Sequence, residues 1–113
     1  MYRKIALIDS GIGGLTLYTQ FIRYLPSITY IADNKYFPYG TKKDSDLINI
    51  IDRIIHYLLN NEYDKVVIAC NTATAVALDS LQKHMPIPVI GVINAGARAA
   101  EKKTKRNEIV VLA

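Results

Sequence analysis

Lys4-Ile-Ala-Leu-Ile-Asp-Ser-Gly-Ile-Gly-Gly14 is the stretch of sequence from which the fold can be worked out. Its first six residues form a short apolar run that ends in an aspartate, and such a run followed by turn residues predicts a buried β-strand. The glycines at positions 11, 13 and 14 predict a tight turn. Residues 16–24 then show helical spacing, which Pro26 stops. A strand, a turn and a helix in this order indicate the first unit of an α/β fold.

The same alternation continues along the chain. Further strands are predicted over residues 28–32, 65–69, 89–92 and 109–112. Further helices are predicted from Asp44 or Ser45 to about residue 59, over 73–84 and over 95–103. Short apolar strands that alternate with helices imply a parallel sheet of about four to five strands with helices on both faces, a three-layer α/β sandwich.

Composition narrows the class of protein. At 113 residues the chain has the size of one modest domain, and its 50% apolar content argues against intrinsic disorder. No apolar run approaches the roughly 20 residues that span a bilayer. The start, Met1-Tyr-Arg-Lys4, leads straight into the first strand without the apolar stretch of a signal peptide. The single cysteine cannot form an internal disulfide, so we expect a reduced, cytoplasmic protein with no membrane partner.

The net charge of +4 is concentrated in one basic run, Lys102-Lys-Thr-Lys-Arg106. No aromatic platform or nucleic-acid motif accompanies this run, so we interpret it as a solvated turn and expect no nucleic-acid partner. His56 and His84 fall in predicted helices, and nothing spaces them as metal ligands. We therefore expect two partly exposed histidines and no metal site.

Three polar clusters follow predicted strands: Asp9-Ser10-Gly11, Asp33 with Pro38-Tyr39-Gly40, and Cys70-Asn71-Thr72. In open parallel sheets, ligands bind beyond the carboxyl ends of the strands. The fold should therefore bring these clusters together, although they lie far apart in sequence. This convergence predicts an active site.

Cys70 lies between a predicted strand and the start of a helix, where the helix dipole and free N–H groups favour the reactive thiolate. A buried cysteine that acts as a small hydrophobe is the alternative. The polar residues Asn71 and Thr72 favour the functional interpretation, because they are suited to binding a carboxylate. Asp9 is either a turn-forming residue or a proton partner beside the substrate or the thiol.

A dinucleotide-binding fingerprint is a rival interpretation of the glycine turn. Gly11 and Gly13 follow the first strand, and Asp33 lies twenty positions beyond Gly13. The third glycine of that pattern is absent, since position 16 is threonine, and Asp9-Ser10 would crowd an approaching pyrophosphate.

Three motifs resemble the hallmark motifs of glutamate racemases in order and spacing. They are Ile8-Asp-Ser-Gly-Ile-Gly-Gly-Leu15, Pro38-Tyr-Gly40 and Ala69-Cys-Asn-Thr-Ala-Thr-Ala75, and the segment Pro88-Val-Ile-Gly-Val92 fits the strand that follows in that family. Threonine at position 74 resembles the pattern of glutamate racemases more than that of the related aspartate racemases, which usually carry histidine at that position. The resemblance covers essentially the whole chain.

The resemblance implies a two-base mechanism without a cofactor, in which one cysteine thiolate removes the Cα proton of glutamate and a second cysteine on the opposite face returns one. Cys70 matches the first cysteine, and Asp9 matches the acidic residue that assists it. The positions that match substrate-binding residues are Asp9, Ser10, Tyr39, Gly40, Asn71 and Thr72. No lysine is placed to bind pyridoxal phosphate. D-Glutamate made in this way would supply peptidoglycan synthesis, and hence cell-wall biogenesis and cell shape, in a bacterial cytoplasm.

The chain departs from the family pattern because it has no second cysteine and no Cys-Thr-His motif. By this comparison, residues 1–97 are an incomplete first α/β domain, and residues 98–113 begin a truncated second domain. We expect the chain to be inactive alone, and its uncovered core surface to favour homo-oligomers. Two alternatives stay open: an aspartate or broad-specificity amino-acid racemase, and a glutamate-binding half-site without turnover.

Overall fold

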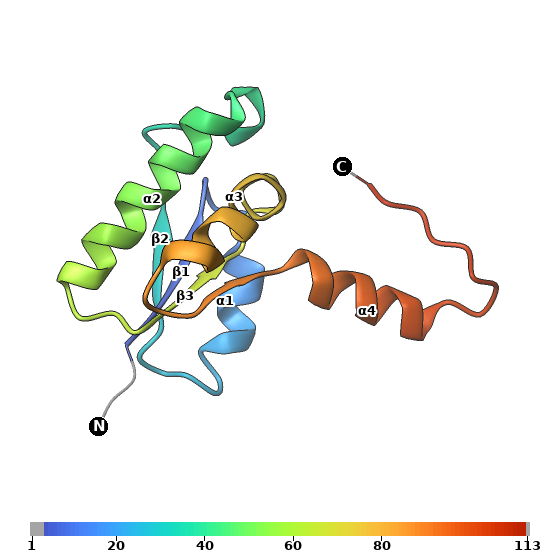
Figure 1. Cartoon of the computed structure of the whole chain (residues 1–113). Helices are drawn as coiled ribbons and strands as arrows, with labels where there is room; N and C mark the ends of the chain where they lie inside the picture. Colours follow the sequence, from blue (N-terminus) through green and yellow to red (C-terminus); the bar gives the residue numbers. More distant parts are fainter. Residues whose placement is uncertain (1–3, 113) are drawn as a thin grey trace.

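The computed structural model describes residues 4–112, so residues 1–3, where a signal peptide was sought, and Ala113 lie outside the described residues. The described strands are β1 Ile5–Asp9, β2 Thr29–Ala32, β3 Lys65–Ile68 and β4 Val89–Gly91 (Figure 1). The helices are α1 Leu15–Phe21, α2 Asp44–Asn60, α3 Asn71–His84 and α4 Ile93–Lys103, and the short 3-10 helix η1 spans Tyr39–Thr41.

The four strands form one parallel sheet in the order β2-β1-β3-β4, which confirms the predicted α/β class. Asp9 at the end of β1 lies beside Ala32 of β2, and Ile8 lies beside Ile68 of β3. The chain therefore moves from β1 to one neighbour, then crosses over β1 to the other. This reversal places a crevice between the carboxyl ends of β1 and β3, where ligands bind in such sheets.

Helices cover both faces of the sheet, as the sequence predicts. Ala6 and Ile8 point to one face, where α2 and α3 pack in the larger core cluster. Ile5 and Leu7 point to the other face, which is covered by α1 alone (Figure 1). Every residue of β1 is buried, because the strand is central and its side chains alternate between two covered faces. The two faces are thus unequally covered.

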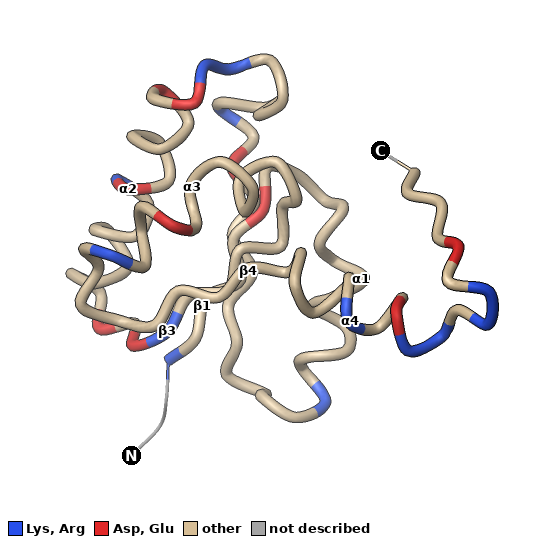
Figure 2. The backbone as a smooth tube through the Cα atoms, turned by 45° about the vertical axis from the view of Figure 1, so that its right-hand side comes forward, with Lys and Arg blue, Asp and Glu red and all other residues tan. Residues whose placement is uncertain are grey.

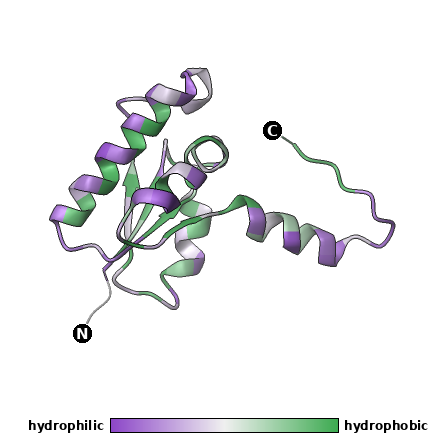
Figure 3. Cartoon of the chain, viewed as in Figure 1, coloured by the Kyte–Doolittle hydropathy of each residue, from purple (hydrophilic) through white to green (hydrophobic). Residues whose placement is uncertain are grey.

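The predicted fifth strand over residues 109–112 is wrong. Within the described residues the sheet has four strands, and Ile109, Val110, Val111 and Leu112 are 52–94% exposed. All residues of α4 are exposed except Ala100, which is half-buried, and the helix carries the apolar end of the chain away from β4 (Figures 1 and 3). An apolar run forms a strand only where it can pair with the edge of a sheet and bury its side chains against a neighbouring layer. Helix α4 brings residues 109–112 to neither.

The basic run lies at the far end of α4 and in the turn that follows (Figure 2). Lys102, Lys103, Lys105 and Arg106 are all exposed, in agreement with a solvated turn. Among residues 4–112, no helix combines the length and the apolar character needed to cross a bilayer.

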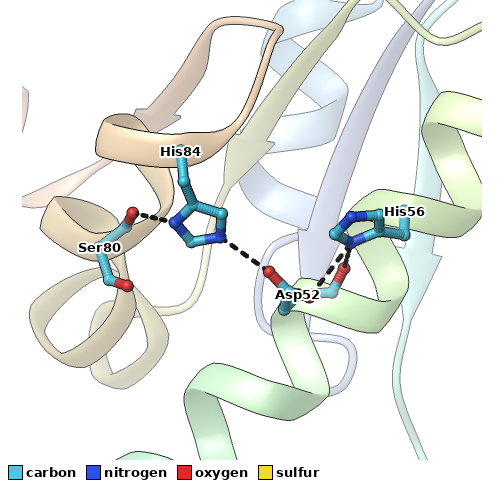
Figure 4. Close-up of polar contacts among 4 residues, drawn as sticks. All are labelled: Asp52, His56, Ser80 and His84. Carbon is cyan, nitrogen blue, oxygen red and sulfur yellow. Dashed lines mark hydrogen bonds and ion pairs between the residues drawn. The ribbon is translucent and has the colours of Figure 1, made fainter.

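Asp52 of α2 joins both histidines of the chain (Figure 4). Its carboxylate lies 2.9 Å from Nε2 of His84 and 3.1 Å from Nδ1 of His56. The other ring nitrogen of His84 faces the carbonyl of Ser80 at 2.6 Å, so both nitrogens face acceptors, an arrangement that favours the protonated ring. The hydrogen bonds to Asp52 and Ser80 raise the pKa of His84 above its usual value. The protonated imidazole therefore links α3 to α2.

Replacement of Asp52 by asparagine should remove this pH-dependent link. Because the folded-state pKa of His84 is raised, its stabilisation is complete below about pH 6.5 and is lost as the pH rises through the folded-state value. Urea unfolding at several pH values should show that the stability difference between the native chain and Asp52→Asn shrinks as the pH rises above about 6.5. Asp79→Asn, which removes an exposed carboxylate from the helix that carries His84, is the matched control. A difference that stays constant over this range would contradict the link.

Gly91 at the end of β4 lets α3 approach the sheet. A Cβ at this position would lie 2.3 Å from Cγ2 of Thr74 and 2.9 Å from Cδ2 of Leu78. Thr74 cannot easily move, since it is buried and its hydroxyl bonds the carbonyls of Ile68 and Cys70 at 3.2 and 2.9 Å. Glycine at 91 therefore fixes the position of the first turns of α3.

We expect Gly91→Ala to lower the free energy of unfolding by about 1–3 kcal/mol, because the added methyl group overpacks the contact with Thr74. Gly96→Ala is the control, since a Cβ there meets no atom within 4 Å and alanine favours a helix. Urea unfolding followed by circular dichroism measures both. Equal stability of the two variants would show that β4 and α3 have room to separate.

Candidate functional site

The three predicted clusters meet at the crevice between β1 and β3. The N–H of Ala69 donates to the carbonyl of Ile8 at 2.8 Å, and the N–H of Asp33 donates to the carbonyl of Asp9 at 2.8 Å. These bonds extend the ladder to the last residue of each strand, so the three loops leave the sheet side by side. The convergence expected from the sequence is confirmed.

Cys70 lies directly after β3 and is the N-cap residue of α3. Its backbone is extended and its side chain is half-buried. The hydroxyl of Ser10 donates a hydrogen bond to Sγ of Cys70 over 3.8 Å, across the crevice from the β1 loop. A hydroxyl donor at the sulfur and the amino end of a helix are surroundings in which reactive cysteines are found. Cys70 thus has surroundings suited to a nucleophile or a base.

Helix α3 begins two residues earlier than the sequence predicts, at Asn71. The first bond of the helix runs from the N–H of Thr74 to the carbonyl of Cys70. The N–H groups of Asn71, Thr72 and Ala73 therefore have no helical acceptor and point beyond the helix end. Asn71 is exposed and Thr72 half-buried, so this end is open to an anion.

Asp9 is buried, with 6% of its surface exposed, and its carboxylate holds the loop that follows it. Oδ1 accepts the N–H of Ser10 at 2.8 Å, while Oδ2 accepts the N–H of Gly14 and lies 3.1 Å from the hydroxyl of Tyr30. Among the described residues, these are all of the hydrogen bonds of the Asp9 carboxylate. The turn-forming role considered for Asp9 is thus present in the structure, whatever it does for the thiol.

Tyr39 turns its side chain into the core. It is 2% exposed, and its hydroxyl donates to Oδ2 of Asp33 at 2.7 Å. Burial and this bond raise the pKa of Tyr39 above its usual range, and the charges of Cys70 and Asp9 add to the rise. Only the backbone of Tyr39 is left to face a ligand. Gly40 beside it is exposed, with open space where a Cβ would stand.

The geometry argues against the dinucleotide interpretation. The carboxylate of Asp33, which would have to bind a ribose, accepts the hydroxyl of Tyr39 and the N–H of Tyr36. Oδ2 of Asp9 accepts the N–H of Gly14 at the start of α1, where a pyrophosphate would bind. Among residues 4–112, no group of three histidine, cysteine, aspartate or glutamate side chains is arranged to hold a metal ion.

Tyr30 belongs to this site, although no pattern in the sequence distinguishes it. It is a half-buried residue of β2, and a tyrosine is common in strands. Its role depends on the register of β1 and β2, which places its ring below the glycine loop. No local signal in the sequence encodes that register.

Asp9→Asn should destabilise the chain by about 1–3 kcal/mol. In the native chain each carboxylate oxygen accepts one backbone N–H, from Ser10 or from Gly14. The asparagine NH2 group would replace one of these oxygens in either orientation and leave that N–H without an acceptor. Asp79→Asn is the control, since Asp79 is an exposed residue of α3. The measurement is urea unfolding of both variants at pH 7. An Asp9→Asn chain as stable as the control would show that the carboxylate does not hold the loop.

The chain is similar in sequence to known proteins. Over residues 22–113 the chain matches the family model described as Asp/Glu/Hydantoin racemase. It is 53% identical to a glutamate racemase of Lysinibacillus sphaericus over 115 residues, which cover 100% of this chain and 43% of that protein. The chain thus spans less than half the length of this relative.

Solved structures match as well. The glutamate racemase of Bacillus anthracis superposes with a TM-score of 0.85 at 44% identity, over 93% of this chain and 40% of that one. The Escherichia coli glutamate racemase, solved in complex with L-glutamate and an activator, gives a TM-score of 0.73 at 33% identity, over 87% of this chain and 40% of that one. Sequence and fold agree, and the chain belongs to the Asp/Glu/hydantoin racemase family.

Proposed function

We propose that this chain supplies one half of the active site of a glutamate racemase, with Cys70 as one of two catalytic bases. The observation that carries the proposal is the placement of the only cysteine at the start of α3, with the hydroxyl of Ser10 on its sulfur. The thiolate takes the Cα proton of glutamate and becomes a thiol, and a thiol on the opposite face returns a proton to Cα. The second thiol would come from a part of the protein outside this chain.

Binding groups for the substrate lie around Cys70. The free N–H groups of Asn71 and Thr72 suit a carboxylate, as does the backbone of Tyr39 and Gly40 at the open side of the crevice. Ser10 would contact the substrate through the hydroxyl that also reaches the sulfur. Such preorganised donors stabilise the charge that develops when a weakly acidic Cα–H is broken. No cofactor is needed for this chemistry.

Asp9 assists the thiol through the loop in this proposal. Its carboxylate fixes the backbone of Ser10 and Gly14, so Ser10 stays opposite Cys70. For this reason Asp9 belongs with Cys70 to the proposed catalytic set. In the proposal its negative charge also faces the substrate amine.

Glutamate is the proposed substrate, because the relatives named above are glutamate racemases and the E. coli protein was solved with L-glutamate. Aspartate or a broader range of amino acids is the runner-up, since Thr74 is buried against Gly91 and offers no contact that selects a side chain. D-Glutamate made in the cytoplasm of a bacterium would serve peptidoglycan synthesis and cell shape. We also propose that a second domain begins near residue 98, supported by the exposure of α4.

A chimaera tests the proposal directly. This chain would replace the aligned 43% of the Lysinibacillus sphaericus racemase, which is 53% identical to it. We expect the chimaera to exchange the Cα proton of both L- and D-glutamate for deuterium in D2O. Cys70→Ser should lower the rate of stereoinversion by about a hundredfold to ten-thousandfold, the usual contribution of a general base.

Two outcomes would contradict the proposal: a folded chimaera without exchange, and stereoinversion that survives Cys70→Ser at an unchanged rate. Thermal unfolding of the chimaera and the parent racemase shows whether each is folded. The 113-residue chain alone should not invert glutamate. If the folded chimaera is inactive but glutamate still slows alkylation of Cys70 in the chain alone, the binding half-site is the better interpretation.

A further inference from the structure

The hydroxyl of Tyr30 lies at the centre of the contacts that hold the glycine loop, residues 11–14. It is 2.6 Å from the carbonyl oxygen of Gly11 and 3.1 Å from Oδ2 of Asp9. Its ring packs edge-on against Tyr18 of α1, with centroids 5.8 Å apart and an interplanar angle of 69°. Tyr30 thus touches both ends of the segment that joins β1 to α1.

The phenol of Tyr30 acts as a hydrogen-bond donor over the whole physiological pH range. Burial raises its pKa to about 12, and the neighbouring charge of Asp9 adds to the rise. The single phenolic hydrogen is shared between the Gly11 carbonyl and the Asp9 carboxylate. Without this hydroxyl, the carbonyl of Gly11 would lose the only hydrogen bond that the described residues give it, and the loop would lose its attachment to β2.

Gly14 shows how closely these groups are packed. A Cβ at position 14 would lie 2.8 Å from Oδ2 of Asp9 and 3.1 Å from the hydroxyl oxygen of Tyr30. The loop therefore approaches the carboxylate and the phenol with no space for a side chain. Such close packing holds the loop, the Asp9 carboxylate and the Tyr30 phenol in a single arrangement. This arrangement also fixes the direction in which Ser10 leaves β1.

We propose that Tyr30 is a positioning residue for Cys70: by holding Gly11 and Asp9, it keeps the hydroxyl of Ser10 on the sulfur of Cys70. The chain of contacts runs from Tyr30 to the Asp9 carboxylate, from that carboxylate to the N–H of Ser10, and from the Ser10 hydroxyl to Sγ. The relevance of this arrangement to catalysis rests on the proposed function. The contact itself can be tested without turnover.

The test is alkylation of Cys70 by iodoacetamide as a function of pH in the 113-residue chain, where it is the only cysteine. A hydrogen bond to the thiolate lowers the pH at which alkylation reaches half its maximal rate. Tyr30→Phe should move this midpoint upward by about 0.5–1 pH unit, which corresponds to the loss of one modest hydrogen bond. Ser10→Ala should move it by the same amount.

The double variant Ser10→Ala/Tyr30→Phe makes the test specific. If Tyr30 acts through Ser10, the two changes are not additive, and the double variant has the midpoint of Ser10→Ala alone. Additive shifts, or no shift in Tyr30→Phe, would overturn the proposal. Tyr18→Phe is the matched control: its ring belongs to the same aromatic pair, its hydroxyl has no partner among residues 4–112, and its midpoint should equal the native one.

Circular dichroism and urea unfolding show whether each variant is folded. If Tyr30→Phe does not fold, Ser10→Ala can still overturn the proposal. An unchanged midpoint in Ser10→Ala would show that the Ser10 hydroxyl does not act on the thiol, and Tyr30 would then have no contact to position. Failure of this test would leave the racemase proposal standing, since deuterium exchange in the chimaera is measured separately. Loss of exchange in the chimaera would in turn leave the alkylation result intact.

Discussion

The carboxylate of Asp9 is the group on which the organisation of the site depends. A buried carboxylate is costly unless several donors satisfy it, and here the N–H groups of Ser10 and Gly14 and the hydroxyl of Tyr30 do so. The same bonds close the loop after β1 and join it to β2. The hydrogen bonds that the buried carboxylate requires therefore fix the path of the backbone at the crevice.

The two faces of the sheet explain where the chain is firmly packed and where it is not. Helices α2 and α3 cover one face together, whereas α1 alone covers the other. A cavity of about 660 Å³ lies on the α1 face, between residues such as Leu17, Phe21 and Val67. Its lining is mainly apolar and includes Ala69, the residue before Cys70, and Gly13 and Gly14 of the loop after β1. This cavity reflects the thinner cover on the α1 face, whereas the proposed chemistry belongs to the crevice at the strand ends.

The sheet, its helices and the meeting of the three clusters could be predicted because each depends on a local pattern. Apolar runs, glycine turns and helix caps lie within a few residues of one another. The failed strand at 109–112 has the right local pattern, but no neighbouring edge receives it. Tyr30, the buried side chain of Tyr39 and the contact of Gly91 with Thr74 depend on register and on helix position, which only the assembled structure contains.

The position of Cys70 follows from the same topology. β1 and β3 are parallel neighbours, and the crossovers leave their carboxyl ends in opposite directions. The loops after these strands therefore lie on two sides of a crevice, and Ser10 meets the sulfur there. Gly91 lets α3 lie close to β4, and the helix in turn directs its free N–H groups into the crevice. A thiol at this point has a donor on one side and a helix end on the other, while its open side is free for a substrate. In the proposed mechanism a second base would act on the opposite face of the substrate, so the complete active site would be built from two parts of the protein.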